Sequence, residues 1–426
     1  MYKNTKYKPI VIGLGYVGLP LVTQIAKKFK VTGFDINKKR VCELRNGLDS
    51  TKEKTRKYLN RIKKKISFEY NVKSLINKNF YIVTVPTPIY KNKKPDLRFI
   101  FKATVMLSKF IKKGDIIVYE CTVYPGLTEK YCGKIISKNS GLKLNEDFYL
   151  GYSPERINPG DKKNTIDKIT KVVSGSNLFA LKRISNFYKR IIPAGIFEAK
   201  NIQTAEAAKV IENIQRDLNI SLINELSLIF NKMGIDTQEV LDAAGTKWNF
   251  LKFLPGLVGG HCIGVDPYYL THKAEAIGHH PEIILAGRRI NDNMSRYVSS
   301  QLIKALVKRK FQIDTARVLV MGLTFKENCP DVRNTKSLDV VYELQEYGIK
   351  VDVMDPCCDE LEVKSKFGID LVNNPESATY DAVIITVRHQ NFIDLGIEKI
   401  RSYGHDEVII YDLKNTFEKT KVDMRL

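Results

Sequence analysis

The sequence contains no C-x-x-C pair, although it has seven cysteines: Cys42, Cys121, Cys132, Cys262, Cys329, Cys357 and Cys358. Their odd number and irregular spacing argue against a disulfide framework and against a structural zinc site. We therefore predict free thiols in a reducing compartment and no metal site.

Long apolar runs are also missing. No segment approaches the roughly 18 apolar residues that span a bilayer, and the amino terminus runs into a strand-like segment with no signal-peptide pattern before it. The sequence predicts a cytoplasmic protein with no membrane partner.

Acidic residues are few beside basic ones, and the formal net charge is +22. The lysines are dispersed, however, and no basic stripe interleaved with aromatic residues or zinc-finger spacing occurs. We interpret the charge as a solvated basic surface and predict no nucleic-acid partner. Steeply salt-dependent DNA binding would support the opposite hypothesis.

Strand-like and helical segments alternate at both ends of the chain. Strands are expected at residues 8–13, up to residue 35, from residue 80, from residue 115 and from residue 171, with a helix over residues 16–29. Towards the carboxyl end, strand-like segments recur from residue 317, with a helix at residues 337–347. Such alternation predicts α/β domains with doubly wound parallel sheets.

The middle of the chain is helical instead. Residues 201–233 lack proline and glycine and carry apolar residues at helical spacing, and a second helix is expected over residues 281–308. We predict two Rossmann-like domains, residues 1–199 and 311–426, joined by a connector of long helices at residues 200–310.

The first strand is followed by GLGYVG, in which Gly13, Gly15 and Gly18 match G-x-G-x-x-G. The first glycine makes the turn, the second lets the backbone approach a pyrophosphate, and the third allows close helix–strand packing. Asp35 ends the next strand, about 20 residues later, where a carboxylate binds the ribose hydroxyls. This favours NAD over NADP, although Arg40 and neighbouring lysines are close in sequence.

The carboxyl-terminal domain lacks this fingerprint. Lys326 and Arg333 follow its first strand, at the edge of the sheet where α/β proteins bind ligands. Two cations there suit an anionic ligand such as a nucleotide diphosphate, although each alone is also a common surface charge.

Cys262 lies in a glycine-rich segment with Gly256, Gly259, Gly260 and Gly264. Glycines allow positive φ angles and close approach of a substrate, so a cysteine there is better placed to react than one in a packed strand. Asp266 follows it closely.

Lys209 and Asn213 are spaced i, i+4 and share one face of the central helix, which Arg216 extends. An asparagine within a helix needs a reason, and contact with a reacting oxygen would supply one. Solvent exposure is the alternative.

Several separated motifs together resemble the UDP-glucose/GDP-mannose dehydrogenase family, and most closely its bacterial UDP-N-acetylhexosamine 6-dehydrogenases of capsule and O-antigen synthesis. They stand in the family's order over nearly the whole chain: GLGYVGLP, DIN, TVPTP, ECTVYPG, SPERINPGD, EAAKVIENIQRDLNI, GGHCIGVDPYYL and GLTFKENCPDVRNTKS.

The resemblance implies an NAD-binding domain, a dimerising helical connector and a UDP-binding domain. Cys262 would be the nucleophile, Lys209 and Asn213 would stabilise oxyanions, Asp266 and Thr122 would position water, and Glu155 would transfer protons. The cofactor contacts would be Gly13, Gly15, Tyr16, Val17, Gly18, Asp35, Arg40, Pro86, Thr87 and Thr122. The substrate contacts would be Glu155, Arg156, Lys209, Asn213, Phe253, Gly259, Lys326 and Arg333.

The expected reaction converts a primary alcohol to an acid and consumes two NAD molecules. Thiolate attack on the aldehyde gives a thiohemiacetal that loses the second hydride, and water hydrolyses the resulting thioester. His261 is not assigned as a base, because neighbours in an extended loop usually point apart.

The motifs do not determine which sugar the nucleotide carries. UDP-GlcNAc or UDP-GalNAc is expected, with UDP-ManNAc, UDP-glucose and GDP-mannose as alternatives. A two-electron 3-hydroxy-acid dehydrogenase and a non-enzymatic nucleotide sensor are the rival functions, and the number of NADH formed per substrate separates them. A homodimer through the central helix is the expected assembly.

Overall fold

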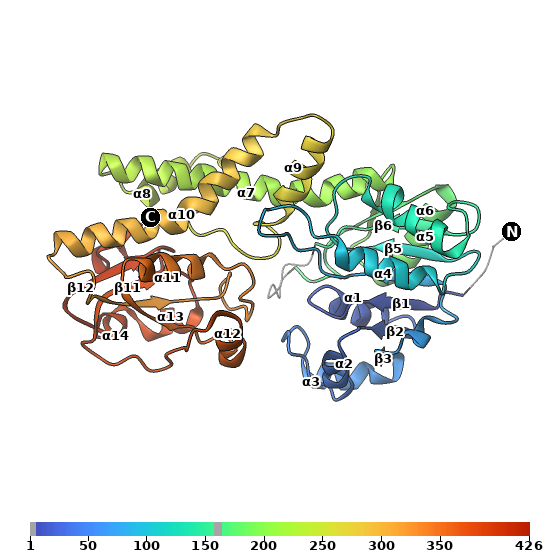
Figure 1. Cartoon of the computed structure of the whole chain (residues 1–426), viewed down its shortest axis with the longest axis horizontal. Coiled ribbons are helices and arrows are strands. Elements are labelled where there is room, and N and C mark those ends of the chain that lie inside the picture. Colours follow the sequence, from blue (N-terminus) through green and yellow to red (C-terminus); the bar gives the residue numbers. More distant parts are fainter. Residues whose placement is uncertain (1–5, 157–163) are drawn as a thin grey trace. The chain divides into compact units, whose positions relative to one another are not determined.

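The computed structural model describes residues 6–156 and 164–426. It divides into two compact units, one of Met1–Glu212 with Tyr268–His279 and the other of Asn213–Pro267 with His280–Leu426. The long helix α7 (Ile202–Met233) runs from one unit into the other (Figure 1). The predicted fold class, two parallel-sheet α/β domains with a long helical connector, is confirmed.

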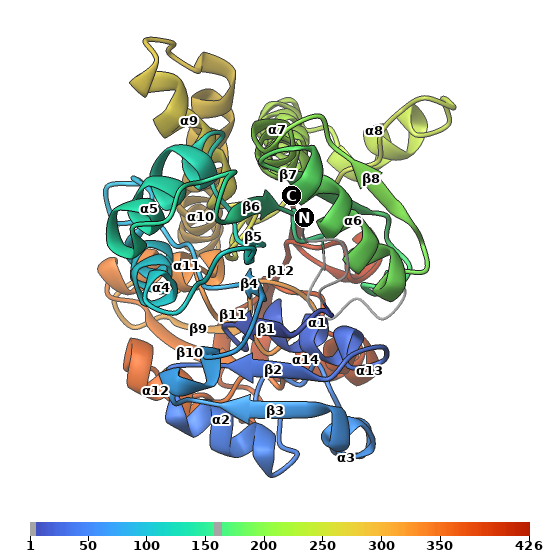
Figure 2. The same ribbon diagram turned by 90° about the vertical axis from the view of Figure 1, so that its right-hand side faces the viewer.

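The first unit is built on an eight-stranded sheet in the order β3-β2-β1-β4-β5-β6-β7-β8, counted over the described residues. Figure 2 shows β1, β2 and β3 side by side. Its strands are β1 (Pro9–Ile12), β2 (Val31–Phe34), β3 (Ile66–Glu69), β4 (Phe80–Val83), β5 (Ile116–Tyr119), β6 (Tyr149–Tyr152), β7 (Lys171–Gly175) and β8 (Ile196–Glu198). The pairings are parallel except that β7 runs antiparallel to β6.

The burial of each strand follows its position in the sheet. Every residue of β1, β4 and β5 is buried, as expected for parallel strands covered on both faces, whereas edge strand β3 alternates between buried and exposed residues. The connecting elements are α1 (Gly18–Ile25), α2 (Lys38–Arg45), α3 (Arg56–Ile62), η1 (Lys63–Lys65), η2 (Val72–Leu75), α4 (Arg98–Ser108), η3 (Thr128–Gly133), α5 (Lys134–Ser140) and α6 (Leu178–Ile191). Helix α1 is shorter than the predicted residues 16–29 at both ends, because the residues before Gly18 form the glycine-rich turn and those after Ile25 form turns.

The central helices other than α7 are α8 (Thr237–Ala244), α9 (Asp266–Ala276) and α10 (Glu282–Lys308). Within the second unit, Arg288 of α10 forms a buried ion pair with Asp217 of α7, at 2.6 Å. Asn291 donates to the same carboxylate at 2.7 Å, so the two helices are joined by a buried polar network.

The carboxyl-terminal sheet has the order β10-β9-β11-β12-β13, and all its pairings are parallel. Its elements are β9 (Arg317–Met321), α11 (Lys336–Glu346), β10 (Lys350–Met354), α12 (Glu360–Phe367), β11 (Tyr380–Ile385), α13 (Gln390–Leu395), α14 (Ile397–Arg401), β12 (Gly404–Asp412), η4 (Lys419–Lys421) and β13 (Met424–Arg425).

Alternate residues of β9 enter two different cores. Val318 and Val320 pack with the apolar side of α11, whereas Leu319 and Met321 pack with residues of α13 and α14. The helices therefore cover opposite faces of the sheet (Figure 1). No helix in the described part of the chain is both long and apolar enough to cross a membrane.

Candidate active site and nucleotide-binding residues

The glycine-rich turn has the geometry that its sequence predicts. Gly13 adopts a φ of +98°, and a Cβ on it would lie 2.7 Å from the Thr84 carbonyl oxygen. A Cβ on Gly18 would lie 1.8 Å from the Gly13 carbonyl oxygen, so close packing requires glycine at both positions. A Cβ on Gly15 would meet no atom within 4 Å, which leaves its backbone open to a ligand.

Tyr16 and Val17 complete this turn, and no side chain caps the start of α1. The N–H groups at such a helix start are suited to a pyrophosphate. Asp35 follows β2, and its carboxylate accepts the backbone N–H groups of Leu14 and Asn37, both at 2.8 Å. Each oxygen keeps a lone pair for a ribose hydroxyl.

Arg40 is hydrogen-bonded to the glycine-rich turn. Its guanidinium donates to the Leu14 carbonyl at 2.9 Å and pairs with Asp49 at 2.8 Å. These bonds give Arg40 a role in fixing the turn. Pro86 and Thr87 follow β4 and Thr122 follows β5, so all three lie at the carboxyl edge of the sheet beside β1.

Glu155 belongs to a buried charged network that the sequence did not indicate. Lys171 contacts Glu120 at 2.6 Å and Glu155 at 3.5 Å, and the Tyr188 hydroxyl also donates to Glu120. Burial disfavours the ammonium, but the two carboxylates outweigh it and raise the pKa of Lys171. Burial raises the pKa of Glu120.

Arg156, next in the chain, forms an ion pair with Glu212. Its guanidinium also donates to the Thr170 carbonyl at 3.3 Å. The predicted motif continues into residues 157–161, which lie outside the described residues.

Cys262 lies on a turn before α9, and its side chain is half-buried. The loop that carries it is held at two points. Asn224 of α7 accepts from the Gly256 N–H at 2.7 Å and donates to the Gly256 carbonyl at 3.0 Å, and Gly260 donates to the Asn334 carbonyl at 3.0 Å. The position of the thiol is therefore fixed by a bound loop, as a nucleophile requires.

The expectation that His261 points away from Cys262 rested on an extended loop, but these residues form a turn, and the thiol is close enough to contribute to the raised pKa of His261. Burial opposes protonation, but Asp331 and Cys262 outweigh it and raise the pKa of His261 to about 9. The imidazole Nδ1 lies 3.4 Å from Asp331 Oδ2.

Asn213 of α7 and Asp266 at the start of α9 are joined, because the Asn213 amide donates to the Asp266 carboxylate. Asp266 is fully buried and Asn213 is half-buried. Lys209 lies one turn earlier on α7 and is 7% exposed, which argues against solvent exposure as the reason for this pair. Arg216, in contrast, is exposed.

A pocket in the second unit collects three lysines at the carboxyl edge of the sheet: Lys326, Lys336 and Lys414. Gly259 from the cysteine loop also lines it, together with Leu257, Thr324, Phe325, Glu327, Thr335, Ser337, Thr386 and Val387. Burial lowers the pKa of Lys414. Lys336 and Lys414 were not predicted, because no motif distinguishes them from surface lysines.

Two predicted substrate residues lie elsewhere. Arg333 contacts Asp331 at 2.6 Å and His261 at 3.3 Å, so it borders the loop that carries Cys262 and does not line this pocket. Phe253 is half-buried in the segment leading to the cysteine loop.

Models of three consecutive domains match the chain, all from the UDP-glucose/GDP-mannose dehydrogenase family. The NAD binding domain matches residues 8–192, the central domain residues 203–293 and the UDP binding domain residues 319–419. The chain belongs to the UDP-glucose/GDP-mannose dehydrogenase family. The predicted family, the cofactor NAD and the dehydrogenase activity are thereby confirmed.

Individual relatives agree with this membership. The dehydrogenase is 56% identical to the UDP-N-acetyl-D-glucosamine 6-dehydrogenase of Pseudomonas aeruginosa, over 98% of this chain and 99% of that protein. It is 53% identical to the enzyme of the same name from Salmonella typhi, over the full length of both. The solved UDP-D-ManNAc dehydrogenase of Pyrococcus horikoshii superimposes with a TM-score of 0.89 at 28% identity, covering 98% of each chain.

Proposed function

We propose that this dehydrogenase oxidises the 6-hydroxyl of UDP-N-acetyl-D-glucosamine to a carboxylate through a thioester on Cys262. The half-buried Cys262 thiol, on a turn that Asn224 and Asn334 hold in place, is the observation that carries the proposal. Identity above 50% to two UDP-N-acetyl-D-glucosamine 6-dehydrogenases supports the choice of sugar. UDP-GalNAc is the nearest alternative, because it differs at one stereocentre.

The amino-terminal domain fits NAD, because Gly15 leaves the turn open and the start of α1 has no capping side chain. Gly13, Gly15, Tyr16, Val17 and Gly18 would hold the pyrophosphate, and Asp35 the ribose. Bound NAD supplies the hydride acceptor, and two equivalents are consumed for each sugar.

In the first oxidation, the 6-hydroxyl loses its proton as a hydride leaves C6. We assign the Lys209 ammonium to the developing alkoxide, because this lysine is 7% exposed and stands one helical turn from Asn213. A donor fixed before the reaction stabilises such charge without reorganisation. Glu155, held by Lys171, is assigned to the proton-transfer network.

In the second oxidation, the Cys262 thiolate adds to the aldehyde, and the tetrahedral oxyanion expels the second hydride to leave a thioester. His261 precedes Cys262 on the same turn, and Asp331 and Cys262 outweigh burial and raise the pKa of this imidazole to about 9. Asp331 holds this imidazole, with its ring nitrogen 3.4 Å from the carboxylate. His261 thus joins the site as a positioning residue.

Water then hydrolyses the thioester. Asp266 and Thr122 are assigned to position that water, and Asn213 to donate to the oxyanion. The hydrogen bond from Asn213 to Asp266 supports this pairing, since it fixes the orientation of both side chains.

The lysine-lined pocket suits the UDP diphosphate, because Lys326, Lys336 and Lys414 bring three cations to one sheet edge. Gly259 supports this placement. A Cβ there would lie 2.5 Å from the Asn334 carbonyl oxygen, so glycine is required where the cysteine loop borders the pocket.

We further propose a homodimer through α7. Four exposed apolar residues of this helix fall on one stripe at spacings of 11, 7 and 4 residues: Ile211, Leu222, Ile229 and Met233. Burial against a second copy would remove this apolar surface from water.

The test is an NAD-reduction assay with UDP-GlcNAc, UDP-GalNAc, UDP-ManNAc, UDP-glucose and GDP-mannose. The proposal expects the highest kcat/KM with UDP-GlcNAc and two NADH per sugar. One NADH per substrate would refute the thioester route, and a higher kcat/KM with another sugar would overturn the assigned substrate.

A further inference from the structure

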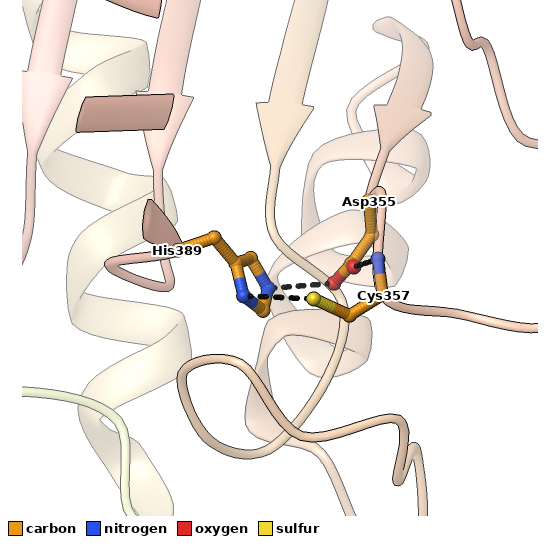
Figure 3. Close-up of side chains that lie close together, drawn as sticks. All are labelled: Asp355, Cys357 and His389. Atoms are coloured by element: carbon orange, nitrogen blue, oxygen red, sulfur yellow. Dashed lines mark hydrogen bonds and ion pairs between the residues drawn. The ribbon is translucent and has the colours of Figure 1, made fainter. Parts of the chain in front are cut away.

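A cysteine, a histidine and an aspartate meet in the carboxyl-terminal domain, and none of them is among the residues assigned to catalysis. Asp355 directly follows β10, Cys357 stands two residues later, and His389 follows β11 (Figure 3). Cys357 Sγ lies 3.3 Å from His389 Nδ1, and His389 Nε2 lies 3.1 Å from Asp355 Oδ2.

Burial and hydrogen bonds define the state of this cluster. The side chains of Asp355 and His389 are fully buried, whereas Cys357 is half-buried. The Asn328 backbone nitrogen lies 3.0 Å from His389 Nδ1, and the Thr324 hydroxyl lies 3.0 Å from His389 Nε2.

We propose that Asp355, Cys357 and His389 bind one zinc ion. Thiolate, imidazole and carboxylate together are a donor set that suits zinc. The three ligand atoms lie within 4.8 Å of one another. In a tetrahedral zinc site, sulfur and nitrogen ligands stand about 3.5 Å apart, and Cys357 Sγ and His389 Nδ1 are 3.3 Å apart.

Binding would release the Cys357 thiol proton to solvent, because the thiolate is the ligand. Because Cys357 is half-buried, an ion can reach it from solvent and pass from it to the two buried ligands. The prediction of no metal site came from chain spacing, and it missed this cluster because Asp355 and His389 follow different strands.

The cluster is connected to the lysine-lined pocket. The ring nitrogen that takes the ion must exchange its present partner, which is the Asn328 N–H at Nδ1 or the Thr324 hydroxyl at Nε2. Thr324 lines the pocket, and Lys326 lies between these two residues in the chain. If the pocket binds UDP as proposed above, zinc would weaken nucleotide-sugar binding.

Zinc binding is tested first, without any reliance on activity. The full chain carrying Cys262→Ala, which removes the other half-buried thiol beside a histidine, is titrated with Zn²⁺ against a chromophoric chelator. The proposal expects one zinc per chain, and a thiolate-to-metal charge-transfer band when Co²⁺ replaces zinc.

Cys357→Ser in the same background should lower the affinity by more than about tenfold and abolish the Co²⁺ band. Cys358→Ser, at the adjacent thiol outside the cluster, is the matched control and should retain both. Far-UV circular dichroism checks folding of each variant. Binding that survives Cys357→Ser, or no binding to the parent, would overturn the site.

The connection to the pocket is tested with the active enzyme. Zinc should raise KM for the nucleotide sugar in the wild type and not in Cys357→Ser. An equal effect in both would place the inhibition at Cys262 and refute the connection. If zinc binds while no nucleotide sugar is oxidised, only the proposed function fails.

Discussion

Asp35 and Asp355 hold the same hydrogen-bonded turn in two different sheets. Asp35 accepts the backbone N–H groups of Leu14 and Asn37, and Asp355 accepts those of Leu323 and Cys357. The two turns differ at the residue that follows Leu14 in the first and Leu323 in the second.

Gly15 leaves the first turn open, whereas Thr324 closes the second by donating its N–H to Asp355 at 2.9 Å and hydrogen-bonding to His389 through its hydroxyl. One turn geometry therefore provides a dinucleotide site in the first domain and the Asp355–Cys357–His389 cluster in the second.

Replacing Cys262 by serine should abolish acid formation, because a serine hydroxyl stays un-ionised at neutral pH and is a much poorer nucleophile than a cysteine sulfur. The readout is NADH formation and uronic acid in the product. Cys42→Ser, at another half-buried thiol, should keep wild-type activity. Full acid production by Cys262→Ser would contradict the covalent route.

Removing the Lys209 ammonium with Lys209→Ala should lower kcat about 100–1000-fold, the usual cost of losing one oxyanion donor. Binding of the nucleotide sugar, measured by calorimetry, should weaken far less. Lys232→Ala, at an exposed lysine of the same helix, is the control. A defect confined to binding would count against the oxyanion role.

The raised pKa of His261, about 9, makes stability depend on pH. Because the folded pKa exceeds the usual 6.5, the contribution of this group is fully present below about pH 6.5 and is lost as pH rises through 9. The melting temperature of the wild type should therefore fall more over this range than that of His261→Gln. The control His405→Gln, at an exposed histidine, should follow the wild type.

Breaking the buried pair of Asp217 and Arg288 should be costly, because an uncompensated charge would remain between α7 and α10. We expect Asp217→Ala to lower the free energy of unfolding by about 3–5 kcal/mol in urea titrations. Asp370→Ala breaks a solvent-exposed pair with Lys364 and should lower the free energy of unfolding far less, because water and salt screen exposed charges. Equal losses would show that burial does not set the difference.

The double substitution Ile229→Lys and Met233→Lys should halve the mass measured by light scattering, because it places charges in the proposed α7 interface. Leu361→Lys, at a leucine of α12 that is 80% exposed, should leave the mass unchanged. A wild-type monomer, or an unaltered dimer in the double variant, would refute an α7 interface.

Elements whose pattern is local could be predicted from the order of the residues alone. Strands β1, β4 and β5 are predicted by their apolar runs, and α7 by its helical period. The residues that bury a whole strand or one helix face are close together in the sequence, so no distant partner is needed to recognise them. The steric roles of Gly13 and Gly18 were predictable for the same reason, because a turn between adjacent elements needs no distant partner. Short strands such as β8 and β13 could not be predicted in this way, because none of their residues is buried.

Features that depend on distant partners became visible in the folded chain. It placed Asp331 beside His261, Lys171 beside Glu155, and Lys336 and Lys414 in one pocket with Lys326. It also brought His389 to Cys357. A side chain's charge state and reactivity follow from the groups within a few ångströms of it, and in a parallel sheet those groups come from the ends of strands far apart in the chain.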